Sequence, residues 1–191
     1  MMIKTSQQNR LDLFCERFRK VNGQASLASD IAEAAEHVVE IIKSQGVKSV
    51  FVSNLFKEVE EQIIQSLSKH VKVYRKEDVV ESPVEKLDDV DAGVSAAAAA
   101  VAETGTLVEV AYDDVERLVS SMPKVHIMLV KASTVVGPVY ELAELIRESF
   151  RSRSAAVTFV SGPSRSGDIE QRLVVGIHGP HVVAAVVLKW L

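Results

Sequence analysis

The sequence predicts an α/β fold with a mainly parallel sheet. In its N-terminal part, amphipathic helical patterns and short apolar runs follow one another in the order helix, helix, strand, helix, strand. This order is typical of parallel sheets whose strands are joined by crossover helices. The length of 191 residues suits one domain with a substantial core. Hydrophobic residues make up 47% of the chain and charged residues 25%, the balance of an ordinary globular protein.

The spacing of apolar residues defines the elements of the N-terminal part. Leu11, Phe14, Cys15 and Phe18 share one face of a helix that we expect to end near Asn22. A buried small side chain is the simplest interpretation of Cys15. The predicted elements are, in order, a helix over 7–20, a helix that ends at Gly46 with Asp30 or alternatively Ser29 as its N-cap, a strand over 48–53, a helix over 57–69 and a strand over 70–74.

The C-terminal part continues this alternation. Residues 95–102 are rich in alanine, which has the highest helix propensity, so we predict a short helix there. The other predicted elements are a loop or short exposed helix over 75–89, a strand over 91–95, a strand over 107–111, a short helix from Asp113 or Asp114 to Ser121, a strand over 125–130, a helix over 138–150, and buried strands over 155–160 and 182–188.

A glycine-rich polar stretch lies between the last two predicted strands. Gly162 and Gly167 permit unusual backbone conformations, Arg165 offers a planar fork for a carboxylate or phosphate, and hydroxyl donors come from Ser161, Ser164 and Ser166. If Asp168 begins a helix, this loop lies at a helix N-terminus, where anions are favoured. In the alternative interpretation, Asp168 only caps the helix and Arg165 pairs with Glu170, so both a binding loop and a structural turn remain open.

Two smaller groups add candidate chemistry. In the turn Glu103-Thr104-Gly105-Thr106, Glu103 could act as a base, a nucleophile or a hydrogen-bond anchor. Alternatively, Glu103 is satisfied by backbone N–H groups or by Arg165. His178 lies in a turn bounded by Gly176 and Gly179 and could titrate near neutral pH, or it could bond a backbone carbonyl. His126 is expected at a sheet edge, and the histidines lack zinc-site spacing, so we predict no metal site.

Composition excludes several classes of protein. A formal net charge of −4 gives no electrostatic case for nucleic acid as the main partner. No apolar run approaches the roughly 20 residues of a membrane span, and the first residues do not resemble a secretory signal, so we expect a cytoplasmic protein. The single cysteine excludes an intramolecular disulfide and a cysteine-held iron–sulfur cluster within this chain. Glycine fingerprints for dinucleotides and phosphate loops are absent, as is a serine nucleophile elbow.

Taken together, four segments resemble the LUD-domain family, and within it the lactate-utilisation protein C-like members. The segments are Glu103–Thr106, Met122–His126, Val157–Glu170 and Gly176–Pro180, in the family's order and spacing. The chain departs from the family pattern at Ser166-Gly167, where Thr-Ala is usual, and at His181, where a basic residue is frequent. The resemblance covers most of the chain from about Asp30 onward, so we expect residues 1–191 to form a single LUD domain with the helix over 7–20 packed on it.

The resemblance implies a three-layer α/β/α sandwich similar to the ribose-phosphate isomerase and CoA-transferase folds. It also implies an accessory or substrate-binding component of an iron–sulfur-dependent system that oxidises L-lactate, or a related 2-hydroxy acid, to pyruvate. In that reading this chain binds no cofactor, and cysteine-rich partner subunits carry the clusters. A small organic anion would bind at loops 103–106 and 161–180, with Glu103 and His178 as candidate catalytic residues and the remaining site residues being Thr104, Gly105, Thr106, Ser161, Gly162, Ser164, Arg165, Asp168 and Gly179.

Other interpretations stay open at this point. The chain could be a stand-alone enzyme of the transferase, isomerase or cyclo-ligase type, acting on a phosphate- or CoA-bearing small molecule with Glu103 as nucleophile or base. It could also be a scaffold whose glycine loops are purely structural. The sequence does not decide whether the chain is catalytic, and it leaves homo-oligomer formation open.

Overall fold

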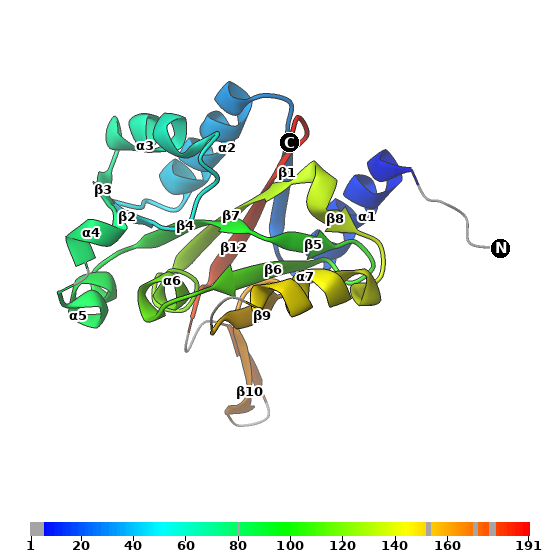
Figure 1. Cartoon of the computed structure of the whole chain (residues 1–191). Helices are drawn as coiled ribbons and strands as arrows, with labels where there is room; N and C mark the ends of the chain where they lie inside the picture. Colours follow the sequence, from blue (N-terminus) through cyan, green and yellow to red (C-terminus); the bar gives the residue numbers. More distant parts are fainter. Residues whose placement is uncertain (1–5, 80, 152–153, 170–171, 176–178) are drawn as a thin grey trace.

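The computed structural model describes residues 6–79, 81–151, 154–169, 172–175 and 179–191 (Figure 1). A six-stranded sheet forms the centre of this described part, and all of its neighbouring strands run parallel. Its strands, in spatial order, are β1 (Gln24–Ala28), β12 (Val182–Leu188), β7 (Val125–Lys131), β4 (Ala92–Ala97), β2 (Ser49–Val52) and β3 (Lys72–Tyr74). The predicted α/β class with a mainly parallel sheet is therefore confirmed.

Two amphipathic helices cover one face of the central sheet. These are α2 (Ile31–Ser44) and α3 (Glu60–Ser68), whose apolar faces pack on the strands in one large core (Figure 1). The predicted cap is confirmed, since the Asp30 carboxylate accepts a hydrogen bond from the Glu33 N–H at 2.9 Å and satisfies a free donor of the first turn. Helix α3 begins later than the sequence predicts, after Val59.

The opposite face carries helices and a second sheet. Helix α1 (Gln7–Lys20) buries Phe14 and Phe18, as its spacing predicts, against the inner residues of β7 and β12. The second sheet has the order β8 (Val135–Val136), β5 (Ala99–Val101), β6 (Thr106–Ala111) and β9 (Ala156–Val160). Helix α7 (Ala143–Ser149) covers its outer side after a 3₁₀ turn, η2 (Val139–Leu142) (Figure 1).

Short elements complete this face. They are α4 (Lys76–Val79), α5 (Pro83–Asp88), α6 (Asp114–Leu118, capped by Asp113) and the 3₁₀ turn η1 (Ala132–Thr134). Helices α4 and α5 are more than exposed loops, because Val79 and Leu87 are fully buried against Phe51. No helix of the described residues is both long enough and apolar enough to cross a membrane.

Two sequence-based expectations about elements are wrong, and one strand was missed. The alanine-rich run 95–102 forms no helix: β4 extends to Ala97 and β5 spans Ala99–Val101. Alanine is used there because its small side chain fits between two packed sheets, and this tertiary constraint overrides helix propensity. The run 155–160 is a half-exposed edge strand rather than a buried one, with Phe159 48% exposed. Strand β1 was not predicted, because its polar residues hide the pattern.

The glycine-rich stretch also differs from its predicted form. Asp168 does not begin a helix; it lies in β10 (Arg165–Ile169), which pairs antiparallel with β11 (Arg172–Val175). In Figure 1, β10 projects away from the two sheets. The argument that a helix N-terminus favours an anion at this loop therefore does not hold.

Candidate functional site

The two predicted motif loops lie against each other. Strands β6 and β9 are antiparallel neighbours, so the turn before β6 and the loop after β9 share one end of the second sheet. A chain of hydroxyl groups joins them: Thr104 Oγ1 lies 2.7 Å from Thr106 Oγ1, which lies 2.7 Å from Ser161 Oγ. Pairing of two distant strands thus brings together residues that the sequence places 55 positions apart.

The C-terminal end of α1 covers these loops. A Cβ on Gly105 would lie 2.4 Å from backbone atoms of Arg17 and Phe18, and a Cβ on Gly162 would lie 2.1 Å from the Val21 carbonyl oxygen. Both glycines also have positive φ, 63° and 79° respectively, which side-chain-bearing residues rarely adopt. The two glycines are therefore required for close backbone approach, independently of any ligand.

Arg165 contacts the same helix end. Its Nη2 donates a hydrogen bond of 2.7 Å to the Val21 carbonyl oxygen. The last turn of α1 also contains Arg17, Arg19 and Lys20, of which Arg19 donates to the Ala25 carbonyl and Lys20 pairs with Glu16. The contribution of α1 was missed at the sequence level, although its basic C-terminal turn is visible there.

The remaining predicted site residues are distributed around this point. Glu103 is exposed, and its backbone N–H donates to the Gly137 carbonyl at 3.3 Å. Ser164 N–H donates to the Pro180 carbonyl at 3.1 Å, and Gly179 has φ 81° beside Ser164, so the ends of the glycine-rich stretch pack together. Asp168 lies on β10, and His178 lies outside the described residues, so its predicted catalytic role stays a prediction.

A second group of polar residues is buried between the two sheets. Ser95 Oγ and His126 Nε2 lie 2.9 Å apart and both residues are buried. His126 is not at a sheet edge as expected: β7 pairs with β12 on one side and β4 on the other. Burial lowers the pKa of His126 to about 3, so the ring is neutral near pH 7. Within the described chain, His126 Nδ1 has no hydrogen-bond partner.

Two more buried residues belong to this group. Strand alternation places Ser53 on the face of Phe51 and places Glu109 on the face of Leu107, toward the space between the sheets. Ser53 Oγ likewise has no partner among the described residues. Burial raises the pKa of Glu109 to about 7, against the opposing effect of a hydrogen bond from Ser120. We call Ser53, Ser95, Glu109 and His126 the interlayer polar cluster.

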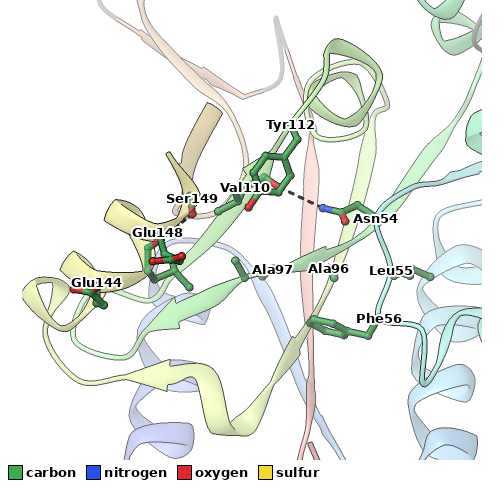
Figure 2. Close-up of a pocket in the computed structure, with 12 residues that line it drawn as sticks. Asn54, Leu55, Phe56, Ala96, Ala97, Val110, Tyr112, Glu144, Glu148 and Ser149 are labelled. Atoms are coloured by element: carbon green, nitrogen blue, oxygen red, sulfur yellow. Dashed lines mark hydrogen bonds between the residues drawn. The ribbon is translucent and has the colours of Figure 1, made fainter. Parts of the chain in front are cut away.

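An open cavity lies at the carboxyl ends of β2 and β4 (Figure 2). Its volume is about 490 Å³. Its lining comes from the loop after β2, the end of β4, the end of β6 and helix α7, namely Asn54, Leu55, Phe56, Ala96, Ala97, Ala98, Val110, Tyr112, Glu144, Leu145, Glu148 and Ser149. Sequence reasoning did not identify this cavity, although the ends of the predicted strands 48–53 and 91–95 mark its position.

The described residues offer no group of side chains suited to bind a metal ion. Among them, no three histidine, cysteine, aspartate or glutamate side chains gather closely enough to hold a metal ion. Cys15 is buried, and burial raises the pKa of its thiol, which keeps it protonated and unreactive near pH 7.

Comparison with known proteins gives consistent matches. Residues 11–188 match the profile of the family described as LUD domain. Among curated proteins, Lactate utilization protein C of Bacillus subtilis (strain 168) is 33% identical over 111 residues, which is 56% of this chain and 46% of that protein. The protein of the same name from an Exiguobacterium species is 39% identical over 102 residues, 51% of this chain and 44% of that protein. The chain thus spans about half the length of the curated relatives it matches.

A solved structure supports the fold over nearly the whole chain. A DUF162 family protein from Deinococcus radiodurans superposes with a TM-score of 0.72 and covers 97% of this chain and 99% of its own. At 23% sequence identity, this likeness establishes the fold, and any argument about function must come from the residues of the site.

Proposed function

We propose, from the premise that this chain belongs to the LUD domain family, that it serves in lactate utilisation by binding a small organic anion. The relatives named Lactate utilization protein C support this role. The proposed ligand is L-lactate or a related 2-hydroxy acid, held where loops 103–106 and 161–165 meet. We further propose that the protein acts in the cytoplasm and binds no cofactor itself.

The hydroxyl chain is the observation that carries this proposal. Three hydroxyl groups, of Thr104, Thr106 and Ser161, own three O–H donors, and the two links between them use two. One O–H donor is therefore left for a ligand. A 2-hydroxy acid carries an oxygen on the carbon next to its carboxylate. That oxygen can accept a hydrogen bond from the free hydroxyl while the carboxylate pairs with a cation.

Arg165 supplies that cation. A guanidinium group has five N–H donors, and the contact with the Val21 carbonyl uses one of them, so a bidentate contact with a carboxylate is still available. The exposed Arg17 at the end of α1 adds positive charge on the same side. The positive charge beside the hydroxyl chain therefore suits an anion better than a neutral ligand.

The proposed partner is a cysteine-rich iron–sulfur protein that removes electrons from the bound acid. Oxidation of a 2-hydroxy acid to a 2-oxo acid releases two electrons, which in this proposal pass to the clusters of the partner, and two protons, which pass to solvent. The chain alone should therefore bind the acid without converting it. Turnover of a phosphate or CoA ester by the chain alone, lost in Glu103→Gln, would instead support the stand-alone enzyme.

Thermal unfolding of the full chain with L-lactate, pyruvate or propionate tests the site. A ligand at about 100 times its Kd stabilises the folded state by about 2.7 kcal/mol, and propionate should do less because it lacks the 2-oxygen. Arg165→Ala should remove the shift. Arg147→Ala, which changes an exposed arginine of α7, is the matched control. A shift that persists in Arg165→Ala would contradict the proposed location.

A further inference from the structure

The cavity at the carboxyl ends of β2 and β4 occupies a topological switch point. These two strands are neighbours in the central sheet, but the chain leaves them in opposite directions. After β2 it turns to α3 on one face, and after β4 it passes into β5 of the second sheet on the other face. Diverging connections leave a crevice at this edge of a parallel sheet, which is where such folds hold small molecules.

The shape of the cavity suits a flat ring. Its volume of about 490 Å³ lies within the range of small-molecule sites. Ala96 and Ala98 form a floor whose side chains are single methyl groups. Phe56 lies to one side of the cavity and α7 to the other (Figure 2). A planar ligand can therefore lie close to the backbone of this segment.

The polar atoms of the lining are mainly acceptors. Asn54 has φ 54°, and its Nδ2 donates to the Val110 carbonyl at 3.3 Å, which fixes the amide and leaves Oδ1 as an acceptor (Figure 2). Glu144 and Glu148 line the α7 side, and no lysine or arginine lines the cavity. Salt bridges from Arg147 and Arg151 outside the lining offset the two carboxylates. This combination favours an uncharged ligand that donates N–H groups, in contrast to the anion proposed for the motif loops.

Three of the four residues of the interlayer polar cluster directly precede lining residues in the sequence. Ser53 precedes Asn54, Ser95 precedes Ala96 and Glu109 precedes Val110 along three different strands. Buried polar atoms without partners are rare in folded proteins, and two of them, Ser53 Oγ and His126 Nδ1, belong to this cluster. Ser53 lies beside the cavity at the carboxyl end of β2, and its unpartnered hydroxyl supports a binding role there. His126 lies in register with Gly93, toward the amino ends of the strands, and is not among the residues that line the cavity.

We infer that this cavity binds a purine ring with an exocyclic amine, of the adenosine class, with the ring on the alanine floor and the amine donating to Asn54 Oδ1. The site is separate from the motif loops, and it adds a second ligand to the proposed function.

Calorimetric titration of the full chain with adenosine tests this inference. Adenosine should bind saturably, and purine riboside, which lacks the exocyclic amine, should bind about tenfold more weakly through the loss of one hydrogen bond. Asn54→Gly should weaken adenosine by a similar factor, because glycine accepts the positive φ but removes the amide. Ala98→Leu should abolish binding by filling the floor, since Ala98 is only partly buried and tolerates a larger side chain.

Asn22→Gly is the matched control, because Asn22 also has positive φ, 66°, and lies outside the cavity. Asn22→Gly should bind adenosine with the affinity of the unchanged chain. Arg165→Ala changes the proposed anion site and should also keep this affinity, so the two proposed sites are tested separately. Absence of saturable adenosine binding would overturn the inference. Equal affinity for purine riboside, or unchanged affinity in Asn54→Gly, would also overturn it.

Discussion

The motif loops and the cavity differ in how their residues are used. The loops contain the glycines, hydroxyl residues and arginine that carry the family resemblance. A Cβ added to Gly105 or Gly162 would lie 2.4 Å or 2.1 Å from the backbone at the C-terminal end of α1. The cavity is lined by small and apolar residues together with Asn54, Tyr112, Glu144, Glu148 and Ser149, and buried polar residues precede three of the lining residues in the sequence. The motif loops are defined by close backbone contact with α1. The cavity is defined by the opposite directions in which the chain leaves β2 and β4.

This difference separates two sources of a sequence motif. A glycine that must hold positive φ beside another backbone has no substitute, so the local sequence is distinctive whether or not a ligand binds. A crevice formed by diverging connections tolerates many linings, so it leaves little trace in the sequence. Substitutions can test whether the loops serve packing, binding or both.

Gly162→Ala and Gly105→Ala should have the largest effect. Each adds a positive-φ cost of roughly 1–2 kcal/mol and an overpacking cost of roughly 1–3 kcal/mol against α1, which together lower the free energy of unfolding by about 2–5 kcal/mol. Denaturant titration measures this change. Gly46→Ala is the matched control: Gly46 has φ 65° but no atom within 4 Å of a Cβ, so only the conformational cost applies. Equal losses at all three positions would mean that contact with α1 contributes nothing.

Glu109→Gln should change how stability depends on pH. The folded pKa of about 7 exceeds the ordinary value of 4.5, so the unchanged chain loses stability as pH rises from about 4.5 to 7. His126 acts oppositely: its folded pKa of about 3 lies below 6.5, so stability is lost as pH falls from about 6.5 toward 3. Between pH 4.5 and 6.5 the two slopes cancel in the unchanged chain.

Without the Glu109 carboxyl, only the histidine slope remains in that window. Relative to the unchanged chain, Glu109→Gln should gain about 1.4 kcal/mol per pH unit, or about 3 kcal/mol between pH 4.5 and 6.5. Urea unfolding at several pH values measures the difference. Glu36→Gln, on the exposed side of α2, should leave the profile unchanged. Parallel profiles for Glu109→Gln and the unchanged chain would show that Glu109 has an ordinary pKa.

Thr106→Val should have a moderate effect. It removes the central hydroxyl of the chain that links Thr104 and Ser161 while keeping the side-chain shape, and should cost about 1 kcal/mol. Thr104→Val, at the exposed end, should cost less. Thermal unfolding of both variants gives the comparison, and equal values would mean that the hydroxyl chain does not stabilise the junction.

Arg165→Ala should have the smallest effect on stability. The residue is exposed, and its bond to the Val21 carbonyl is accessible to water, so we expect a loss below about 1 kcal/mol. A loss as large as that of Gly162→Ala would place Arg165 among the packing residues and remove the reason to assign it to a ligand.

Much of the fold could be predicted from local patterns. The apolar spacing of 7–20, the Asp30 cap and the β-branched runs of β2, β7 and β12 each depend on residues close in sequence. The alanine run 95–102 misled, because its conformation depends on packing between two sheets rather than on propensity. Strand β1 escaped notice because its partner, β12, lies at the other end of the chain.

The candidate sites were predictable only in part. The chemistry of the loops was readable from their residue types, but the pairing of β6 with β9 that unites them is a long-range contact. The burial of His126 and Glu109 depends on the second sheet, which no local pattern revealed. Whether the loops bind an anion, and whether Glu103 or His178 takes part, are still predictions.

The position of β12 affects how the protein forms during synthesis. This strand enters the central sheet between β1 and β7, so β1 has no neighbour there until the last described residues have emerged from the ribosome. Until then, the edge of β7 that pairs with β12 is open, and the core under α1 lacks the side chains that β12 contributes. Nascent chains should therefore depend on chaperones until translation of β12 is complete, and early termination within β12 should yield chains that are degraded.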